Sequence, residues 1–373
     1  MKVLMVTNRV KTYALGFQNV IIPLQQLGHE VYWAADFSNF IGDKNSIPCK
    51  IRQIDIVSYP FHKTNLKALK QIKKIIKEEG IEAVQCSTPI GGALGRIAAY
   101  QCRLKHIIYT AHGFLFFKGA PLINRTIYKW EEMLLSHITD TLITINPEDF
   151  KAAQSLKMRN NTKPYMVHGA GVKVGVEVDV DVQAKRKSIG IPEGATMIIS
   201  AGDLNINKNN HVVIRALGHL KNPNIYYVQC GVGPEEENLR HLAKECGVEN
   251  NALFLGYRTD MPELMKSTDI FVMPSFREGV PRSILEAMDL GKPCVGSKTR
   301  GIADLIDDGI GGYICKPTDH KAFAEAFSKL MNDKDLCIRM GAHNKEKAKG
   351  FSYEIVRQEY IDIYSKVLNQ QLL

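Results

Sequence analysis

Short runs of apolar residues alternate with longer stretches of helical period along the first half of the chain. Residues 3–7, 30–34 and 83–86 have the length and composition of buried strands. Between and after them, apolar side chains recur every three or four positions at residues 16–27, 66–77 and 92–102. This alternation predicts βαβ units and a parallel sheet.

The alternation of strands and helices starts again beyond residue 195. Strands are expected at residues 197–201, 225–230, 252–255, 270–273, 294–296 and 313–315. Helices are expected between them at residues 209–219, 235–246, 261–267, 283–290 and 320–332. Two sheets explain this restart better than one large sheet, so the predicted fold class is α/β with two doubly wound, Rossmann-like domains that face each other across a cleft.

The expected boundary between the domains lies at residues 168–172, where small residues interrupt the periodicity. Residues 1–168 and 169–352 then form the two domains. The last stretch, residues 353–373, begins with a helical period and is expected to form a helix that packs back on the first domain. Because ligands of open α/β sheets bind beyond the carboxyl ends of the strands, two such domains offer a site for two substrates.

Composition agrees with a folded, two-domain protein: 45% of the 373 residues are hydrophobic and 23% are charged. No apolar run reaches the roughly 18 residues that span a bilayer, so the chain is expected to be soluble or peripheral to a membrane. The eight cysteines are scattered and include no C-x-x-C pair, which predicts free thiols in a reducing cytoplasm.

The charge is distributed unevenly between the two halves. Residues 1–168 contain 22 lysines and arginines against 12 acidic residues, a net charge of +10, whereas residues 169–373 contain 26 against 27, a net charge of −1. The basic half either faces something anionic, such as a membrane surface, a phosphorylated acceptor or nucleic acid, or presents a merely solvated surface.

The helix expected at residues 66–77 contributes much of this positive charge. Its apolar positions are Leu66, Leu69, Ile72, Ile75 and Ile76, and the remaining arc contains Lys67, Lys70, Lys73, Lys74 and Lys77. Two interpretations are open: the helix packs its apolar face on the sheet and solvates its lysines, or it rests its basic face on anionic lipid. In the second case each lysine contributes roughly 1 kcal/mol.

The strongest local signal is the stretch of residues 276–288, which follows an expected strand. It supplies the candidate ligand-binding residues Glu278, Gly279, Val280, Pro281, Arg282, Ser283 and Glu286. The free N–H groups at the helix start and the Arg282 guanidinium would converge on a diphosphate. The two glutamates suit the hydroxyl groups of a sugar and a ribose, which donate hydrogen bonds to carboxylates.

A second loop, residues 201–210, follows the strand expected at residues 197–201. Gly202 lets the backbone approach a ligand closely, and Lys208 offers three donors and a positive charge to phosphate. The loop is not a P-loop, because the Gly-Lys-Ser/Thr ending is absent, and no G-x-G-x-x-G follows the first strand.

Together these residues resemble glycosyltransferase family 4, whose members are retaining enzymes with the GT-B fold. Glu278 and Glu286 match the two glutamates of the family, which are separated by seven residues, and Gly202, Leu204 and Lys208 match its Gly-x-Leu-x-x-x-Lys element. The resemblance covers essentially the whole chain and extends to residues 28–31, to residues 301–306 and to the turn around Gly16.

Two departures from the family pattern leave the exact sugar contacts open. The Gly-Gly pair of many members is replaced by Leu15-Gly16-Phe17, and Asp304 stands where a glutamate is common.

The resemblance implies a role for each of these residues. Lys208 and Arg282 would bind the donor diphosphate, Glu286 the ribose hydroxyls and Glu278 the transferred sugar, while Arg258 would lie against the base. It also implies that no divalent metal and no cofactor is needed, in agreement with basic groups and a helix N-terminus that can neutralise the leaving diphosphate. The pair Asp179 and Asp181 falls in the expected linker and is interpreted as structural.

His112 begins the loop after the strand expected at residues 107–111. A lone histidine is often structural, but this position and a match to a family histidine that contacts the donor sugar favour a functional role. The aromatics of residues 114–117 are expected to be exposed beside Lys118, Arg125 and Lys129. Residues 110–120, which include Lys118 and Gly119, and residues 144–149 look like the subgroup that extends polyprenyl-diphosphate-linked saccharides.

The hypothesis is therefore a retaining transferase that moves a hexose or N-acetylhexosamine from a UDP-sugar to a polyprenyl-diphosphate-linked saccharide. Residues 1–168 would be the acceptor side and residues 169–352 the donor side, and the protein would sit on the cytoplasmic face of an anionic cell membrane. Two alternatives remain open: a GT-B UDP-N-acetylhexosamine epimerase, and a nucleotide-sugar or nucleic-acid binding module without catalysis. Against nucleic acid, the chain has no arginine-rich stripe or aromatic ladder.

Overall fold

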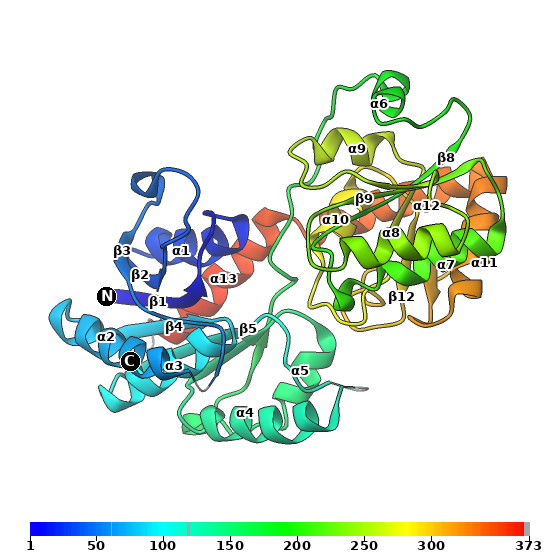
Figure 1. Cartoon of the computed structure of the whole chain (residues 1–373). Helices are drawn as coiled ribbons and strands as arrows, with labels where there is room; N and C mark the ends of the chain where they lie inside the picture. The colour runs from blue at the N-terminus through cyan, green and yellow to red at the C-terminus, as the bar shows by residue number, and fades with distance from the viewer. Residues whose placement is uncertain (61, 118–119, 369–373) are drawn as a thin grey trace. The chain divides into compact units, whose positions relative to one another are not determined.

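The computed structural model describes residues 1–60, 62–117 and 120–368, and the chain divides into two compact units (Figure 1). Unit 1 combines Met1–Gly171 with Tyr353–Leu373, and unit 2 is Val172–Ser352. Each unit contains one parallel sheet with helices on its faces. The predicted class, α/β with two doubly wound domains, is confirmed.

The sheet of unit 1 has seven strands in the order β3-β2-β1-β4-β5-β6-β7. They are β1 (Lys2–Arg9), β2 (Glu30–Asp36), β3 (Lys50–Gln53), β4 (Ala83–Ser87), β5 (His106–Ala111), β6 (Thr141–Thr144) and β7 (Tyr165–Met166). The helices are α1 (Leu15–Gln26), α2 (Lys63–Glu78), α3 (Pro89–Gln101), α4 (Lys129–Ser136), α5 (Pro147–Ala153) and α13 (Tyr353–Leu368), with the short η1 (Lys44–Ser46), the π-helix η2 (Asn124–Tyr128) and η3 (Arg159–Asn161). Strand β3 was not predicted, because its polar side chains hide the strand pattern.

The sheet of unit 2 has six strands in the order β10-β9-β8-β11-β12-β13. They are β8 (Thr196–Ala201), β9 (Ile225–Cys230), β10 (Ala252–Phe254), β11 (Ile270–Met273), β12 (Cys294–Ser297) and β13 (Gly312–Cys315). The helices are α6 (Val182–Ser188), η4 (Ile206–Lys208), α7 (Asn210–Leu220), α8 (Glu236–Glu245), α9 (Met261–Ser267), α10 (Arg282–Asp289), α11 (His320–Asn332) and α12 (Lys334–Lys349). Buried apolar clusters cover both faces, as expected for a doubly wound sheet.

Helix α2 packs on unit 1 through Ala68, Ile72 and Ile76. Leu66, which was expected on its apolar face, is instead 66% exposed, because the buried row follows positions 65, 68, 72 and 76 and Leu66 lies one position away. Lys67 pairs with Asp55 at 2.7 Å between Nζ and Oδ2. The basic side of α2 is thus a charged surface without a continuous apolar row.

All eight cysteines are free thiols, as predicted. Burial raises the pKa of Cys86 to about 12 and that of Cys49 to about 12, so these thiols are protonated near neutral pH. Within the described residues, no helix is both long and apolar enough to cross a bilayer.

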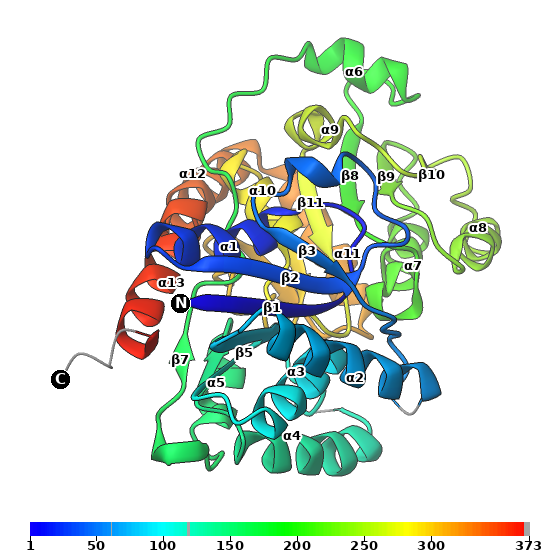
Figure 2. The ribbon, with the colours of Figure 1, turned by 90° about the vertical axis from the view of Figure 1, so that its left-hand side faces the viewer.

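Helix α13 returns to unit 1 at the end of the chain and lies beside α1 (Figures 1 and 2). Glu359 fixes it by accepting hydrogen bonds from the backbone N–H of His168, at 2.9 Å, and from the ring Nδ1, at 2.5 Å. The Tyr353 hydroxyl donates to Gln18 Oε1 of α1 at 3.3 Å.

The His168–Glu359 contact predicts a pH-dependent contribution to the stability of unit 1. The hydrogen bond to Glu359 raises the pKa of His168 above its ordinary value near 6.5. The stabilisation is therefore fully present below pH about 6.5 and is lost as the pH rises through the raised pKa. NMR titration should show that Glu359→Gln lowers the His168 pKa, and an unchanged pKa would contradict this account.

Candidate active site

The candidate residues of unit 2 lie where the strand order of its sheet reverses. Strand β8 has β9 on one side and β11 on the other, so the chain winds in opposite directions from this point. Loops that leave the carboxyl ends of β8 and β11 are neighbours at such a switch point, and ligands of doubly wound sheets bind there. These two loops are residues 202–208 and residues 274–281.

Backbone and side-chain hydrogen bonds join the two loops. The Phe276 N–H donates to the Asn207 carbonyl at 2.8 Å, and Asn207 Nδ2 donates to the Arg277 carbonyl at 3.0 Å. Next to this junction, Lys208 Nζ lies 2.8 Å from Glu278 Oε1 in a partly buried ion pair. The structure therefore brings together Lys208 and Glu278, two residues that are 70 positions apart.

The local backbone explains why Lys208 points to this place. It ends η4, and Asn205 caps this short helix by accepting from the Lys208 N–H at 3.2 Å. Gly202 has φ +149°, and a Cβ at this position would lie 3.1 Å from Lys208 Cε. The backbone conformation therefore favours glycine, and a Cβ would also press on the lysine side chain that crosses this position.

Asn209 is a structural residue of the site that sequence reasoning missed. Its backbone is left-handed, at φ 54° and ψ 33°, and its buried Nδ2 donates to the Pro274 carbonyl at 2.9 Å and to the Pro317 carbonyl at 2.8 Å. The Asn209 side chain thus ties the loop after β8 to the loop after β11. Adjacent asparagines at positions 209 and 210 were the available signal, since asparagine tolerates this conformation.

Helix α10 begins at Arg282 beside the same loops. Its N-cap is Pro281, which provides no capping side chain, and its first turn contains no acidic residue. The N–H groups at this end are consequently left to water or to a bound anion, and the helix dipole favours an anion. Ser283 follows Arg282 in the first turn.

Glu286 lies one turn further along α10. Its Oε1 is 3.4 Å from Arg282 Nη2, in a partly exposed ion pair between positions i and i+4. Burial raises the pKa of Glu286, against the opposing influence of Arg282. A carboxylate in this surrounding gains from further hydrogen-bond donors, which ribose hydroxyls would supply.

A third loop, after β12, supports the backbone next to Glu278. Arg300 Nε donates to the Glu278 carbonyl at 3.3 Å, and a Cβ on Gly301 would lie 2.0 Å from the Gly279 carbonyl oxygen. Asp304 Oδ2 accepts from the Gly301 N–H at 2.9 Å and holds this turn. Asp304, the departure from the family pattern noted above, thus supports the loop next to Glu278.

The loop after β9 was not among the predicted site elements, although its Gly-Val-Gly-Pro sequence is a turn signal. A Cβ on Gly231 would lie 1.9 Å from the Gly202 carbonyl oxygen, and one on Gly233 would lie 2.2 Å from the Leu204 carbonyl oxygen. The loop after β9 therefore packs closely against the loop of residues 202–208.

Arg258 belongs to a separate ion-pair cluster in unit 2. Its Nε and Nη2 bind the two oxygens of Asp260 at 2.8 and 2.6 Å, and Lys185 Nζ lies 2.6 Å from Asp260 Oδ2. The hydrogen bonds from Arg258 hold the pKa of Asp260 well below its usual range. The predicted contact of Arg258 with a base stays a prediction.

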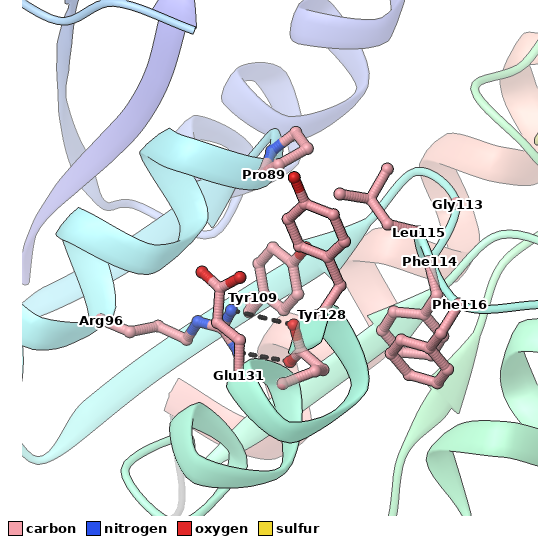
Figure 3. Close-up of a pocket in the computed structure, with 10 residues that line it drawn as sticks. Pro89, Arg96, Tyr109, Gly113, Phe114, Leu115, Phe116, Tyr128 and Glu131 are labelled. Atoms are coloured by element: carbon pink, nitrogen blue, oxygen red, sulfur yellow. Dashed lines mark hydrogen bonds and ion pairs between the residues drawn. The ribbon is translucent and has the colours of Figure 1, made fainter. Parts of the chain in front are cut away.

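His112 and Gly16 are the candidate residues of unit 1. His112 directly follows β5, as predicted, and this residue is exposed. A small cavity of about 40 Å³ lies beside this loop, lined by Tyr109, Leu115 and Tyr128 among others (Figure 3). Gly16 is the second residue of α1, and a Cβ there would meet Ala170 Cβ at 3.6 Å without a clash.

The expectation of exposed aromatics after His112 was wrong for Phe114 and Phe116. Both are buried, and their rings stack at 4.7 Å between centroids (Figure 3). The loop is held against α5 here, because the Phe114 N–H donates to Asp149 Oδ2 at 3.2 Å. Lys118 and Gly119 lie outside the described residues.

Two sequence families match the chain in succession. The model of the "Glycosyl transferase 4-like" family matches residues 2–146, and that of the "Glycosyl transferases group 1" family matches residues 181–347. The "Putative glycosyltransferase EpsD" of Bacillus subtilis is 34% identical over 92% of this chain and 91% of its own length. The chain is a glycosyltransferase of family 4. The predicted family is thereby confirmed.

Further relatives are more distant but span most of the glycosyltransferase. The "UDP-Gal:alpha-D-GlcNAc-diphosphoundecaprenol alpha-1,3-galactosyltransferase" of Escherichia coli is 25% identical over 85% of this chain and 83% of its own length. Among solved structures, HepE of Anabaena in complex with UDP superposes with a TM-score of 0.81 at 20% identity, over 98% of this chain and the whole of that one. This neighbour shows that the glycosyltransferase has the GT-B fold.

Proposed function

We propose that this glycosyltransferase moves a hexose or N-acetylhexosamine, with retention of configuration, from a UDP-sugar to a polyprenyl-diphosphate-linked saccharide in bacterial polysaccharide assembly. The transfer takes place at the cytoplasmic face of the cell membrane. The observation that carries the proposal is the Lys208–Glu278 ion pair beside the uncapped N-terminus of α10. A cation and free N–H groups suit a diphosphate, and an adjacent carboxylate suits the hydroxyls of its sugar.

In this proposal, charge on the leaving diphosphate is stabilised by groups of unit 2. Lys208 turns from Glu278 toward the phosphates, and Arg282 and the N–H groups of α10 contribute further donors. Such preorganised groups are worth most where negative charge develops in the transition state. We assign the neutralisation to these groups without a metal ion, so activity in EDTA is expected to equal activity in added Mg²⁺.

Retention follows, in this proposal, from attack on the face that the diphosphate leaves. The oxygen of the acceptor hydroxyl forms its bond to the anomeric carbon while the bond from that carbon to the diphosphate breaks. A phosphate oxygen of the donor takes the proton of the attacking hydroxyl. Glu278 holds the sugar and Glu286 the ribose. The anomeric coupling constant of the product in NMR tests this: a product of inverted configuration excludes the same-face route.

The relatives support the nature of the two substrates. The name of the Escherichia coli relative gives UDP-galactose as its donor and a diphosphoundecaprenol-linked sugar as its acceptor, and the HepE neighbour was solved with UDP. The excess positive charge of residues 1–168 suits an acceptor that carries a diphosphate at an anionic surface.

Product analysis with and without acceptor separates transfer from its alternatives. Release of UDP that depends on a polyprenyl-diphosphate-linked saccharide supports the transferase. Interconversion of the UDP-sugar without acceptor would instead identify an epimerase. Salt-sensitive binding to plain oligonucleotides without any sugar transfer would favour a binding module.

A panel of UDP-sugars should reveal the donor through thermal stability. A ligand at 100 times its Kd stabilises the folded state by about 2.7 kcal/mol, which corresponds to a rise in Tm of roughly 5–10 °C for the unit that binds it. Lys208→Ala should abolish the rise, whereas Lys244→Ala, at an exposed position of α8, should preserve it. Equal protection in both variants would remove Lys208 from the donor site.

A further inference from the structure

The segment of residues 122–134, which contains η2 and the first part of α4, exposes a row of large apolar side chains on unit 1. We call this row the apolar stripe; it consists of Leu122, Ile123, Ile127, Trp130 and Leu134, which are between 53% and 74% exposed. From Ile123 onward the spacing is four, three and four residues, so these side chains follow one side of a helical segment. A contiguous apolar row at the surface marks a site of interaction.

A buried ion pair determines which side of α4 faces the solvent. Glu132 is buried, and its two oxygens bind Arg96 Nη1 at 2.5 Å and Nη2 at 3.1 Å. Arg96 is itself buried in α3, with its guanidinium 3.9 Å from the Tyr109 ring centroid. Turning the stripe inward would carry Glu132 into the solvent and leave the Arg96 charge buried without its partner. The apolar side of α4 is thereby held outward.

Basic and acidic side chains both lie near the apolar stripe, and the exposed charged residues of its own segment are basic. Arg125 and Lys129 are exposed on the same segment and line a groove of about 540 Å³ beside α5, together with the apolar Phe116, Leu122 and Leu156. The groove also contains Glu148 and Asp149, and Asp149 is hydrogen-bonded to the Asn146 side chain. A surface that combines apolar side chains, a tryptophan and basic groups matches the interface of an anionic bilayer.

We propose that the apolar stripe docks unit 1 on an anionic lipid bilayer, with its side chains at the boundary of the acyl chains and Arg125 and Lys129 at the lipid phosphates. The inference rests on the part of the proposed function that sets transfer at a membrane, and it assigns the contact surface. It also moves the principal contact from α2, whose apolar row is buried, to the segment of residues 122–134. The net charge of unit 1 supplies attraction at longer range.

The two tryptophans of the chain make a direct test possible. Trp33 is fully buried and donates to Thr7 Oγ1 at 2.9 Å, whereas Trp130 is 64% exposed in the apolar stripe. Vesicles of phosphatidylcholine with phosphatidylglycerol should shift the tryptophan emission to shorter wavelength, and pure phosphatidylcholine should do so much less. Trp130→Phe should bind the same vesicles without the spectral shift.

Variants of the apolar stripe then test the surface itself by sedimentation with these vesicles. Ile127→Ser combined with Leu134→Ser should weaken binding by about tenfold or more, because two apolar side chains no longer enter the lipid. Arg125→Gln combined with Lys129→Gln should weaken binding to anionic vesicles and reduce its dependence on salt. The control is Ile338→Ser, which removes an exposed isoleucine from α12 of unit 2 and should bind as the parent does.

Two outcomes would overturn the proposal. One is equal vesicle binding by the parent and the stripe variants. The other is an absence of vesicle binding together with self-association that the Ile127→Ser/Leu134→Ser variant abolishes in light scattering, which would assign the stripe to contact between copies of the chain. Thermal protection by UDP-sugars in buffer without lipid should be the same in all these variants, so its absence would count against the proposed function and not against the docking surface.

Discussion

Replacing Glu278 with glutamine is expected to lower the kcat of sugar transfer by about 10²- to 10³-fold at saturating donor. The leaving of the diphosphate places positive charge on the sugar, and the carboxylate that faces it stabilises that charge, whereas an amide of the same shape does not. The structure places this carboxylate 2.8 Å from Lys208 Nζ, at the switch point of the sheet. Steady-state rates of UDP release in the presence of acceptor provide the measurement.

The fold should survive this change, because Glu278 is held by its backbone as well as by its side chain. The Arg300 contact is made to the Glu278 carbonyl, which the substitution retains. The control is Glu249→Gln at an exposed position of unit 2, which should leave kcat unchanged. If the Glu278→Gln protein has the Tm of the parent and transfers sugar at the parental rate, Glu278 does not contact the sugar.

Truncation of Glu132 to alanine is expected to destabilise unit 1 by about 3–5 kcal/mol. The change leaves the Arg96 guanidinium, whose side chain is 1% exposed, without the carboxylate that binds it at two points. An uncompensated buried charge is costly, whereas a well-packed apolar replacement of the whole pair is not. Denaturant unfolding of the Glu132→Ala variant, followed by circular dichroism, measures the loss.

Two companion variants separate the charge effect from simple loss of packing. Glu131→Ala, on the same helix but without a described ion pair, should cost much less. Arg96→Met combined with Glu132→Leu should recover most of the stability, because neither charge is then left buried. A double variant as unstable as Glu132→Ala would show that the ion pair is not the source of the effect.

The sequence was sufficient to predict those parts of the candidate site that lie within one continuous segment of the chain. The spacing of Glu278 and Glu286 around a strand, a turn and a helix start led to the loop after β11 and to α10, and the structure has both elements there. The contacts that support these residues were not predictable. Gly301 approaches the Gly279 carbonyl, and Gly231 approaches the Gly202 carbonyl. Each contact joins loops that follow different strands, and the sequence of one loop does not indicate which other loop will lie beside it.

Strand β3 and the exposed surface of α4 are two further features that depend on tertiary contacts. Residues 50–53 lack an apolar pattern and become a strand because β2 offers them hydrogen-bonding partners. In α4, the structure buries the charged Glu132 together with Leu135 and exposes the apolar Trp130 and Leu134. The periodicity of a helix identifies two sides and does not state which one the rest of the protein will cover.

By itself, then, the sequence determined the parts of this glycosyltransferase that depend on neighbours along the chain: the alternation of strands and helices, the two parallel sheets, and the loops that hold Lys208 and Glu278. These follow from side-chain periods of two and 3.6 residues and from the turn residues between them. Only the tertiary structure decided that Lys208 meets Glu278 across 70 positions, and that Arg96 holds Glu132 inside and turns Trp130 outward. The physical reason is that a buried charge must find its partner in space, and the position of that partner is set by the packing of the whole unit.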